Sequence, residues 1–478
     1  MYQFSGKVRP CRKNILSRKS NLSVSLYVME GLSTDIPGQQ SILVFVHKRS
    51  LRSDYVFRQI FNRILRVSYR ITTQLEEFVA YNGPKLSYTE SRLGNEFHIR
   101  STGLLYEKGI VKQDIRPGEW RGLPVIFRTG ENASVPFDLF SAAFFLITRY
   151  EEYLLPQEKR DEHGRFPYRY STAFSYGFLD KPVIELWLRE FRDVFTAKFP
   201  DFRFPEPHFF VRPLLAVTVS HAFKNKGFIR LTGGILDDFF HFRLKKTWQR
   251  IRYAFSGKKD PYDTFLKFIA LQKQTGCPFL AFFLVGTYSN FDHNISPNRP
   301  ALRRIIKTFA DYTDIGLLIS YYAARNEEMF DFERHRLEDL IHKPVEKVHF
   351  HYYRQTFPKS YRLLWEKEIK ADFSMGYPDI IAYRASTAHP FPFYDLSEET
   401  ETDLMIHPVV ISDYKLNFHL RLKPGKALEK LIETGEEIRS LGGWFQPVFH
   451  NAVLSEFEDW KGWSQVYMEF YRHFCANG

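Results

Sequence analysis

The residues of this sequence that could do chemistry are polar side chains at the ends of short apolar runs. His221 follows the run LLAVTVS, His351 ends VHFH, and His450 ends PVFH. Neutral imidazole binds divalent metals and exchanges protons near neutral pH. If the apolar runs are parallel strands of one barrel, their polar ends meet at a single cleft. The residues that we place there are Ser220, His221, Leu318, Ser320, His349, His351, Asp372, Arg384, His407, His450 and Asn451.

A histidine at a strand end also has a simpler, structural interpretation. His349 shares a strand face with His351, and His407 precedes a proline that indicates a turn. A structural role is the simpler hypothesis for both. His450 differs because it ends the last expected strand beside Asn451, a second hydrogen-bonding side chain. We therefore expect His450 to be functional.

The elements that would position these residues alternate between short apolar runs and helical stretches from Leu214 onward. This alternation predicts parallel strands joined by crossover helices, and about seven strands favour closure as a (β/α) barrel. An open doubly wound sheet is the alternative, but the sequence lacks the glycine motifs of nucleotide-binding folds, so nucleotide binding has no support. The expected strands are Leu214–Ser220, Pro278–Val285, Ile315–Ser320, Val345–Tyr353, Ile380–Ser386, Leu404–Ile411 and Trp444–His450.

The first half of the chain has its own α/β or α+β pattern. Four prolines between Pro200 and Pro213 disfavour both helix and central strand, so we place a domain boundary there. We expect a basic, unstructured leader at 1–40, a smaller accessory domain at 41–205 and the barrel-like domain at 206–478. The elements predicted before the boundary are strands at Ser23–Val28, Ser41–His47, Glu96–Ile99 and Val125–Phe127, and helices at Asp54–Ile64, Pro136–Tyr153 and Val183–Phe199.

Cysteine usage and the distribution of apolar residues indicate a cytoplasmic protein. The three cysteines, Cys11, Cys277 and Cys475, are odd in number and far apart, so they predict neither a disulfide framework nor a metal motif. We find no signal peptide and no apolar run long enough to span a membrane. We therefore expect a cytoplasmic location, with the periphery of a membrane as the alternative.

Two basic segments account for much of the net charge of +12. Six cations precede the first acidic residue, Glu30, in the leader. The second segment, Arg243–Lys259, places Trp248, Ile251 and Phe255 at helical spacing among cations. We expect a surface helix with a narrow buried stripe there, although such a helix could also lie on a membrane or an anionic glycan. No nucleic-acid-binding motif occurs, so nucleic acid is not an expected partner.

Several longer runs resemble a known family. The runs DPYDTF, FLAFFLVG, IGLLISY, FPKSYRLLWE, DFSMGY, YRASTAHPFPFYDL, MIHP and VFHNAVLSE resemble, in order and spacing, polysaccharide deacetylase-like proteins of the nodulation type from Bacteroidetes-type bacteria. Upstream, YNGPKLSY, PFDLFSAAFFLITRYEEY and DEHGRFP are similar to the N-terminal domain that accompanies that deacetylase domain. The resemblance covers roughly residues 41–478.

The resemblance implies a metal-dependent hydrolase on a (β/α) barrel that removes acetyl groups from N-acetylated sugars. An Asp and two His side chains would hold a zinc-like divalent metal, an Asp would act as base, and a His would protonate the leaving amine. Carried over by position, the roles are catalytic for His450, Asp372 and Arg384, metal-binding for His351 and His221, and substrate-binding for His407, Ser320, Tyr321 and Asn451.

The sequence departs from the family pattern where the metal should bind. The stretch 218–222, which reads TVSHA and includes Ser220, stands where the family has an Asp-x-Asp-like pair of carboxylates. Leu318 stands where the family has a ligand histidine. The family's Arg-Gln-His becomes His349-Phe350-His351, and Ser386 replaces a glycine. Without a metal the attacking water keeps a pKa near 15.7 rather than about 7, so it is not activated at neutral pH.

Two functions from different classes follow. The first is a deacetylase-like protein of surface-glycan metabolism that binds an N-acetylated carbohydrate and has a degraded metal site with weak or no hydrolysis. The second is an active metal-dependent N-deacetylase with a histidine-rich site built from His221, His351 and His450. A third, less favoured, hypothesis is a protein that binds membranes or nucleic acid through its basic segments.

Overall fold

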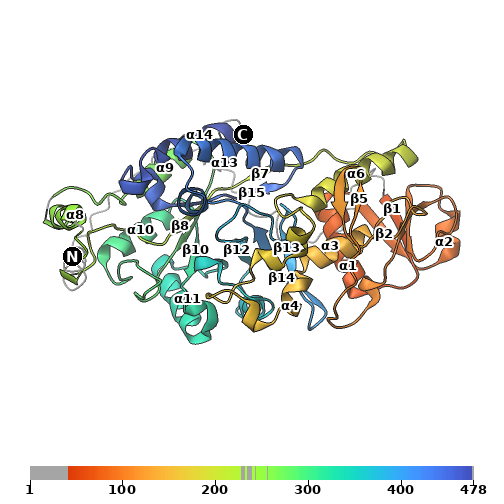
Figure 1. Cartoon of the computed structure of the whole chain (residues 1–478), viewed down its shortest axis with the longest axis horizontal. Helices are drawn as coiled ribbons and strands as arrows, with labels where there is room; N and C mark the ends of the chain where they lie inside the picture. The colour runs from red at the N-terminus through yellow and green to blue at the C-terminus, as the bar shows by residue number, and fades with distance from the viewer. Residues whose placement is uncertain (1–40, 228–231, 234–239, 243, 256, 476–478) are drawn as a thin grey trace, which may run out of the picture. The chain divides into compact units, whose positions relative to one another are not determined.

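The structure is a computed structural model that describes residues 41–227, 232–233, 240–242, 244–255 and 257–475. The basic leader, together with the strand expected at Ser23–Val28, lies outside the described residues. The described residues form one compact unit. Two larger sheets, one of four strands and one of eight, organise this unit (Figure 1).

The four-stranded sheet of the first half is entirely parallel, in the order β2-β1-β3-β4. Its central strand β1 has the sequence SILVFV, and all but its first residue are buried, as expected for a strand covered on both faces. Parallel strands with helical connections make this half α/β. Its elements are β1 (Ser41–Val46), α1 (Leu51–Phe57) continued by a π-helical segment (Arg58–Ile64), β2 (Ser68–Thr72), α2 (Leu75–Ala80), β3 (Lys85–Thr89), β4 (Phe97–Arg100), β5 (Gly118–Trp120), β6 (Leu123–Val125), α3 (Leu139–Ile147), α4 (Tyr150–Leu154), α5 (Thr172–Ser175) and α6 (Val183–Lys198).

The single helix predicted from Pro136 to Tyr153 is instead two helices, α3 and α4. The break lies at Arg149, whose φ of 53° and ψ of 41° are left-handed. In this conformation the buried guanidinium of Arg149 donates hydrogen bonds to Glu151 and Glu152 in the first turn of α4, at 2.7 and 2.9 Å. A buried cation needs such partners, and they offset the cost of the left-handed backbone.

The second half is a barrel-like α/β domain, as predicted. Its eight-stranded sheet has the order β13-β14-β12-β11-β10-β9-β8-β16, and all neighbours are parallel except β13 and β14. A bridge between Ser412 and Val448 joins the chain after β14 to β16, across the side that strand pairing leaves open. The strands are β8 (Leu214–Val217), β9 (Leu280–Phe283), β10 (Asp314–Ile319), β11 (Lys347–Phe350), β12 (Ala371–Met375), β13 (Phe391–Asp395), β14 (Thr400–Pro408) and β16 (Val448–His450), with a short pair β7 (Phe210–Val211) and β15 (Trp444–Phe445) beside them.

Helices connect these strands on the outside of the barrel (Figure 1). Five of them, α9 to α13, follow the predicted alternation. Helix α8, in the connection between β8 and α9, lies in the segment where a surface helix is expected, and α14 is an additional helix. Their bounds are α8 (Leu244–Phe255), α9 (Phe265–Thr275), α10 (Pro300–Ala310), α11 (Glu327–Ile341), α12 (Lys359–Glu366), α13 (Pro424–Ser440) and α14 (Trp463–Phe474). None of the described helices is both long and apolar enough to span a lipid bilayer.

Four further predictions about local structure are wrong. The strand expected at Trp444–His450 is two short strands, β15 and β16, which belong to different sheets. The segment Ile380–Ser386, expected to be a strand, is a loop, because Arg384 and Ile380 pack against the first half of the chain. The strand at this place in the sheet is β12, which precedes the loop. The buried stripe expected on α8 is not formed at Trp248 and Ile251, which are 61% and 42% exposed. The side chain of Phe255 is not among those that the structure describes. Cys277 and Cys475 form a disulfide, with Cα atoms 5.5 Å apart.

The disulfide was not predictable from spacing, because 198 residues separate the two cysteines and the fold alone brings them together. Cys277 precedes β9, and Cys475 ends α14. The pairing removes the cysteine argument for a reducing compartment.

The interior of the barrel is filled by alternate residues of its strands. Leu214, Phe282, Leu318 and Phe373 belong to one buried cluster, while the adjacent residues Leu215, Phe283 and Leu317 belong to the larger core outside the strands. This alternation follows from the two-residue period of a strand. The interior is therefore a packed lumen, and any binding site must lie at its rim.

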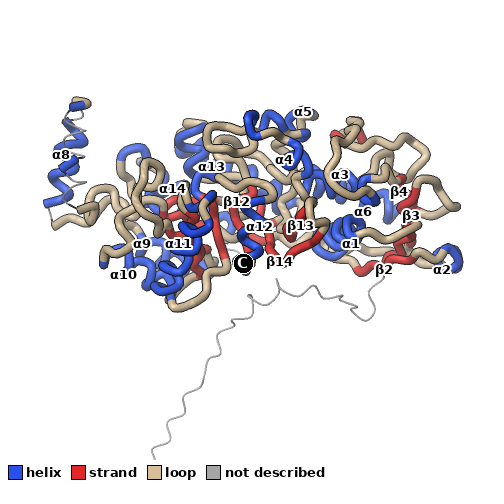
Figure 2. Tube along the Cα trace, turned by 90° about the horizontal axis from the view of Figure 1, so that it is seen from below, coloured by secondary structure: helices blue, strands red, loops and turns tan. Residues whose placement is uncertain are grey.

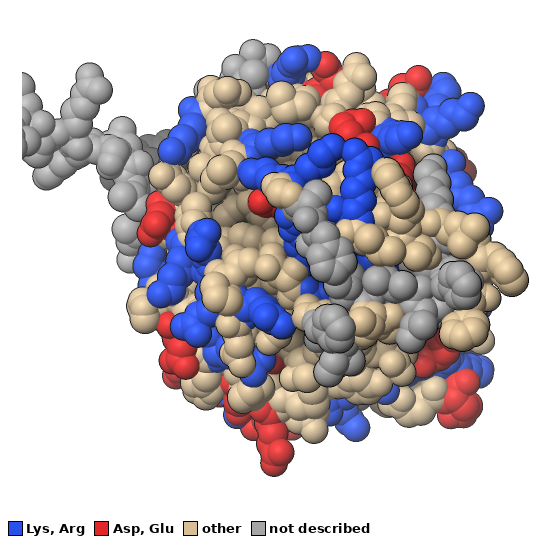
Figure 3. Space-filling view, turned by 90° about the vertical axis from the view of Figure 1, so that its left-hand side faces the viewer, with Lys and Arg blue, Asp and Glu red and all other residues tan. Residues whose placement is uncertain are grey.

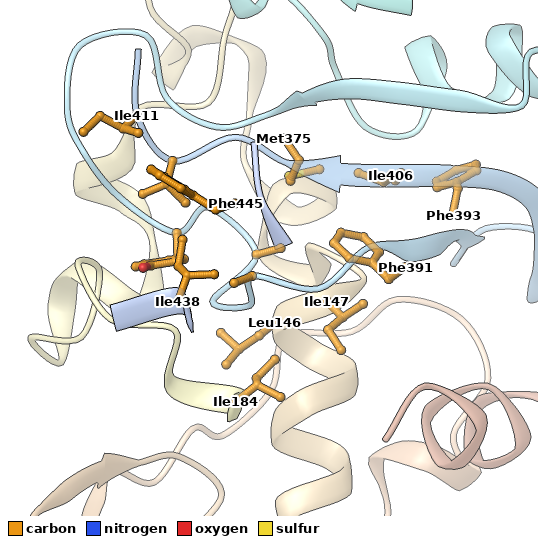
Figure 4. Packing of buried hydrophobic residues seen from close by; sticks show 14 of the residues in the cluster. Leu146, Ile147, Ile184, Met375, Phe391, Phe393, Ile406, Ile411, Ile438 and Phe445 are labelled. Atoms are coloured by element: carbon orange, nitrogen blue, oxygen red, sulfur yellow. The ribbon is translucent and has the colours of Figure 1, made fainter. Parts of the chain in front are cut away.

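The larger core runs through both halves of the chain. Leu146, Ile147 and Ile184 from the first half pack in one cluster with Phe391, Phe445 and other residues of the second half (Figure 4). A buried ion pair crosses the same boundary: Glu152 of α4 accepts two hydrogen bonds from Arg384, at 2.9 and 2.7 Å. Both side chains are at most 2% exposed.

Candidate functional site

Two of the predicted histidines, His349 and His407, lie in the lumen. The Nδ1 of His349 donates to the carbonyl of Phe373 at 2.6 Å, and the Nδ1 of His407 lies 3.0 Å from Oε1 of Gln446. The His407 ring also stacks on Phe373, with centroids 4.1 Å apart. Burial lowers the pKa of each imidazole to about 3. Both histidines are therefore neutral side chains packed in the lumen, which favours the structural hypothesis over the substrate-binding role carried over for His407.

His351 lies at the rim, two residues beyond His349. Its Nδ1 is 2.9 Å from Oδ1 of Asp292, a carboxylate in the connection after β9. Burial raises the pKa of Asp292, but hydrogen bonds from His351, Ser289 and the backbone of Tyr321 outweigh burial and hold the pKa below its usual value. An ionised Asp292 fixes the proton of His351 on Nδ1 and leaves Nε2 for a ligand or a proton transfer.

His450 makes a second pair of the same kind at the end of β16. Its Nδ1 lies 2.7 Å from Oδ1 of Asp413, and its backbone N–H donates to Oδ2 at 2.6 Å. Asp413 is buried, whereas the His450 side chain is 18% exposed. The carboxylate thus orients the imidazole and leaves its Nε2 uncommitted, the arrangement that general acids and bases use.

Leu318 and Ser320 share one face of β10, but neither presents a metal donor to the rim. Leu318 is 1% exposed within the lumen cluster. The hydroxyl and backbone N–H of Ser320 both donate to the buried carboxylate of Glu333, at 2.5 and 3.1 Å. Burial raises the pKa of Glu333 to about 7. Ser320 is therefore engaged with Glu333 rather than with solvent.

Ser220 and His221 follow β8 and are held by a separate set of contacts. Ser220 donates from its hydroxyl and its backbone to Asn294, at 2.8 and 2.9 Å, and the Nδ1 of His221 lies 3.1 Å from the same hydroxyl. The neighbouring carboxylate of Asp260 accepts backbone N–H groups of the turn after His221. Burial lowers the pKa of His221, which favours a neutral ring.

Three further predicted site residues do not face the rim. Asp372 lies within β12 with the opposite orientation to the lumen residue Phe373, and it accepts from Tyr361 of α12 at 3.1 Å. Burial raises the pKa of Asp372 to about 7. Arg384 is committed to Glu152 and the carbonyl of Gly376. Asn451 donates to the carbonyls of Val219 and Tyr262, at 3.1 and 3.3 Å, and so joins β16 to β8.

The first half of the chain contributes a turn to this rim. The turn Asp161–Phe166 places His163 beside Tyr321, with Nδ1 and the hydroxyl 3.0 Å apart. Arg354 and Arg325 donate to its carbonyl groups, and Arg165 donates to the carbonyl of Tyr352 at 3.0 Å. Tyr321 also stacks on Phe291 at 3.7 Å. The β9–β11 side of the rim is therefore lined by both halves of the chain.

Aromatic side chains at the rim remain open to solvent. Tyr288 follows β9, Tyr322 follows β10 and Tyr414 follows β14, and each is between 43% and 48% exposed. Tyr414 also lies beside His450, with ring centroids 5.5 Å apart. Exposed tyrosines combine an apolar ring face with a hydroxyl, so they suit ligands that present both, such as sugars.

Among the described residues, these donors do not form a set that fits a metal ion. Within the ranges that the structure describes, no three His, Cys, Asp or Glu side chains come together as a metal site would require. His351 and His450 each have the carboxylate partner that ligand histidines usually have, but Leu318 and Ser320 add no third donor. What these residues can do without a metal is bind hydroxyl and amide groups and exchange protons.

Sequence reasoning missed three residues of this site. Asp292 and Asp413 lie in loops rather than at the immediate ends of strands, although an acidic residue after VVIS was a signal for Asp413. His163 lies in the quoted run DEHGRFP, but nothing in the sequence indicated that the tertiary fold brings it to the rim.

Comparisons with known proteins are limited to part of the chain. Residues 42–200 match the model of a family of unknown function, DUF7033. No curated protein gives a significant match.

Among solved structures, the chain is similar to a putative polysaccharide deacetylase from Mycobacterium smegmatis, at 14% identity over 57% of this chain and 87% of that one, with a TM-score of 0.39. It is also similar to Puue allantoinase, at 11% identity over 56% of this chain and 85% of that one, with a TM-score of 0.35. A third is a probable polysaccharide deacetylase from Pseudomonas aeruginosa PAO1, at 11% identity over 56% of this chain and 86% of that one, with a TM-score of 0.32.

Proposed function

We propose that the protein is a polysaccharide deacetylase-like protein of surface-glycan metabolism that binds an N-acetylated glycan at the barrel rim and hydrolyses it weakly or not at all. The observation that carries the proposal is the pair of carboxylate-oriented histidines, His351 and His450, at the rim. Leu318, which the resemblance aligns with a ligand histidine, is buried in the lumen below that rim. Two imidazoles can hold hydroxyl and acetamido groups. They cannot by themselves activate water to the extent that a bound metal does.

The exposed tyrosines support a sugar as the ligand. Tyr414 beside His450 would give a pyranose ring an apolar surface, while Nε2 of His450 contacts a polar substituent. The motif resemblance favours the N-acetylated class, because acetamido sugars are what such deacetylases act on.

An active N-deacetylase is the second candidate. This candidate is favoured by Asp292 and Asp413, whose carboxylates bond to Nδ1 of the two rim histidines. An imidazole with such a carboxylate partner is both a good metal ligand and a good general acid. In that case His450 would protonate the leaving amine.

Titration of the full chain with chito-oligosaccharides by calorimetry tests the proposal. We expect binding that weakens about tenfold in His351→Ala and in His450→Ala, and no acetate release when zinc, cobalt or nickel is added. His473→Ala is the matched control, because His473 also pairs with a carboxylate, Glu436, but lies on the outer helix α14. Its affinity should equal that of the wild type.

Metal analysis of the purified protein separates the two candidates. A stoichiometric divalent metal with metal-dependent acetate release would overturn the degraded-site proposal, and loss of that release in His450→Ala would assign the acid. No binding of any chito-oligosaccharide would overturn the glycan class.

A further inference from the structure

The helix α8 carries an apolar stripe that the rest of the described chain leaves open. Leu244, Trp248 and Ile251 are all exposed, and so are Phe240 and Phe242 just before the helix. At about 100° per residue, positions 244, 248 and 251 fall within roughly 60° of one another around the helix axis. The three side chains therefore form one continuous stripe rather than scattered exposed residues.

The opposite face of α8 is the one that attaches the helix to the body. Tyr253 stacks on Phe223, with centroids 5.4 Å apart and planes 4° apart, and its edge meets Phe457 at 6.0 Å. Position 253 lies about 140° from Trp248 around the axis. In Figures 1 and 2, α8 stands apart from the barrel helices α9 and α10. The stripe thus points away from the side that holds the helix.

The same segment is strongly and uniformly basic. Residues 243–259 contain seven Lys or Arg and no Asp or Glu. The guanidinium of Arg252 lies 5.0 Å from the Trp248 ring centroid, so positive charge borders the stripe itself. Figure 3 shows Lys and Arg side chains gathered on the side of the molecule where α8 lies.

We propose that α8 docks on an anionic lipid surface. Trp248 and its neighbours would enter the headgroup region, where tryptophan is favoured, while the cations contact lipid phosphates. An anionic glycan or nucleic acid would need the charge but not the apolar stripe. A second copy of this chain would bring the same positive charge to the interface, which disfavours self-association. Of these partners, only an anionic lipid surface would contact both the apolar stripe and the positive charge.

Co-sedimentation of the full chain with vesicles tests the proposal. We expect binding to vesicles of phosphatidylcholine with about 30% phosphatidylglycerol, and little binding to phosphatidylcholine alone. The variant Leu244→Ser/Trp248→Ser/Ile251→Ser should bind the anionic vesicles at least about tenfold more weakly, because it loses the apolar insertion. Trp365→Ser, which changes a partly exposed tryptophan on α12, should bind as the wild type does.

Two measurements keep this test decisive. The variants must keep the wild-type circular dichroism and melting temperature, as exposed substitutions should. In the wild type, lipids brominated on the acyl chain should quench tryptophan fluorescence, and the loss of Trp248 should abolish that quenching.

Because every protein tested keeps the basic leader, equal binding of the triple variant and the wild type would assign binding to other segments and overturn the proposal. Equal or stronger binding of both to a soluble anionic polysaccharide, with no bromolipid quenching, would overturn it in favour of a glycan partner.

Discussion

Two pairs of histidines in one barrel show how far a short step along a strand changes the role of a side chain. His349 and His407 are buried in the lumen and bond to a carbonyl and an amide. His351 and His450 lie at the rim, are 17% and 18% exposed, and bond to buried carboxylates. His349 and His351 are only two residues apart, a rise of about 7 Å.

The difference lies in what each partner does to the ring. A carbonyl or amide partner satisfies an N–H without stabilising a positive charge, so burial keeps the lumen histidines neutral. A carboxylate partner orients the ring and can stabilise a charged imidazole while the other nitrogen stays accessible. The lumen histidines therefore serve packing, and the rim histidines can serve a ligand.

The largest expected contrast is in acid stability. The unfolded pKa of histidine is about 6.5 and the folded pKa of each lumen histidine is about 3, so the unfolded state binds more protons between these values. Each lumen histidine then lowers the free energy of unfolding by about 1.4 kcal/mol per pH unit as the pH falls through that window.

Asp372 and Glu333 act in the opposite direction, because their raised pKa of about 7 favours the folded state as the pH falls. The informative quantity is therefore the difference between wild type and His349→Gln/His407→Gln. Urea unfolding at pH 7, 6, 5 and 4 should show that the variant loses less stability than the wild type. Parallel curves would contradict the assignment of both lumen histidines as neutral.

The next contrast is between single alanine substitutions. His407→Ala should cost about 3 kcal/mol of unfolding free energy, because Phe373 loses its stacked ring and Gln446 loses its partner. His450→Ala should cost about 1 kcal/mol, since that ring is partly exposed. Chito-oligosaccharide affinity should show the reverse order, and a larger stability loss for His450→Ala would mean that the rim histidine is structural.

Restoring ligands would sharpen the comparison further. Leu318→His with Ser220→Asp adds one donor on the lumen face of β10, opposite His349, and one donor after β8. Zinc affinity by competition with a chromophoric chelator should rise at least about tenfold. Leu318→Met with Ser220→Asn is the matched control, because it keeps similar volumes without adding a good ligand, and it should leave zinc affinity unchanged.

The smallest expected effect concerns the turn from the first half. His163→Ala removes the hydrogen bond to Tyr321 but leaves the backbone contacts of Arg325 and Arg354. Glycan affinity should fall about threefold, with a stability change below about 1 kcal/mol. An unchanged affinity would place the glycan away from the β9–β11 side of the rim.

The sequence predicts the rim better than it predicts the partners of the rim residues. Apolar runs ending in histidine place His351 and His450 correctly, because parallel strands share one carboxyl end. Asp372 was assigned to a strand end, but it lies inside β12, and the two-residue period turns it toward α12. Asp292, Asp413 and His163 arrive through loops, whose paths no periodic pattern encodes.

The ion pair between Glu152 and Arg384 bears on how the protein can be produced for study. Arg384 is 2% exposed and finds its counter-charge on a different half of the chain, and Glu152 is shared with Arg149 as well. A fragment expressed from about residue 206 would keep Arg384 and lose Glu152, together with the apolar side chains of α3 that cover the same surface. Such a fragment would expose an apolar surface that carries an unpaired cation. Recombinant work on the barrel is therefore best planned with residues 41–205 attached.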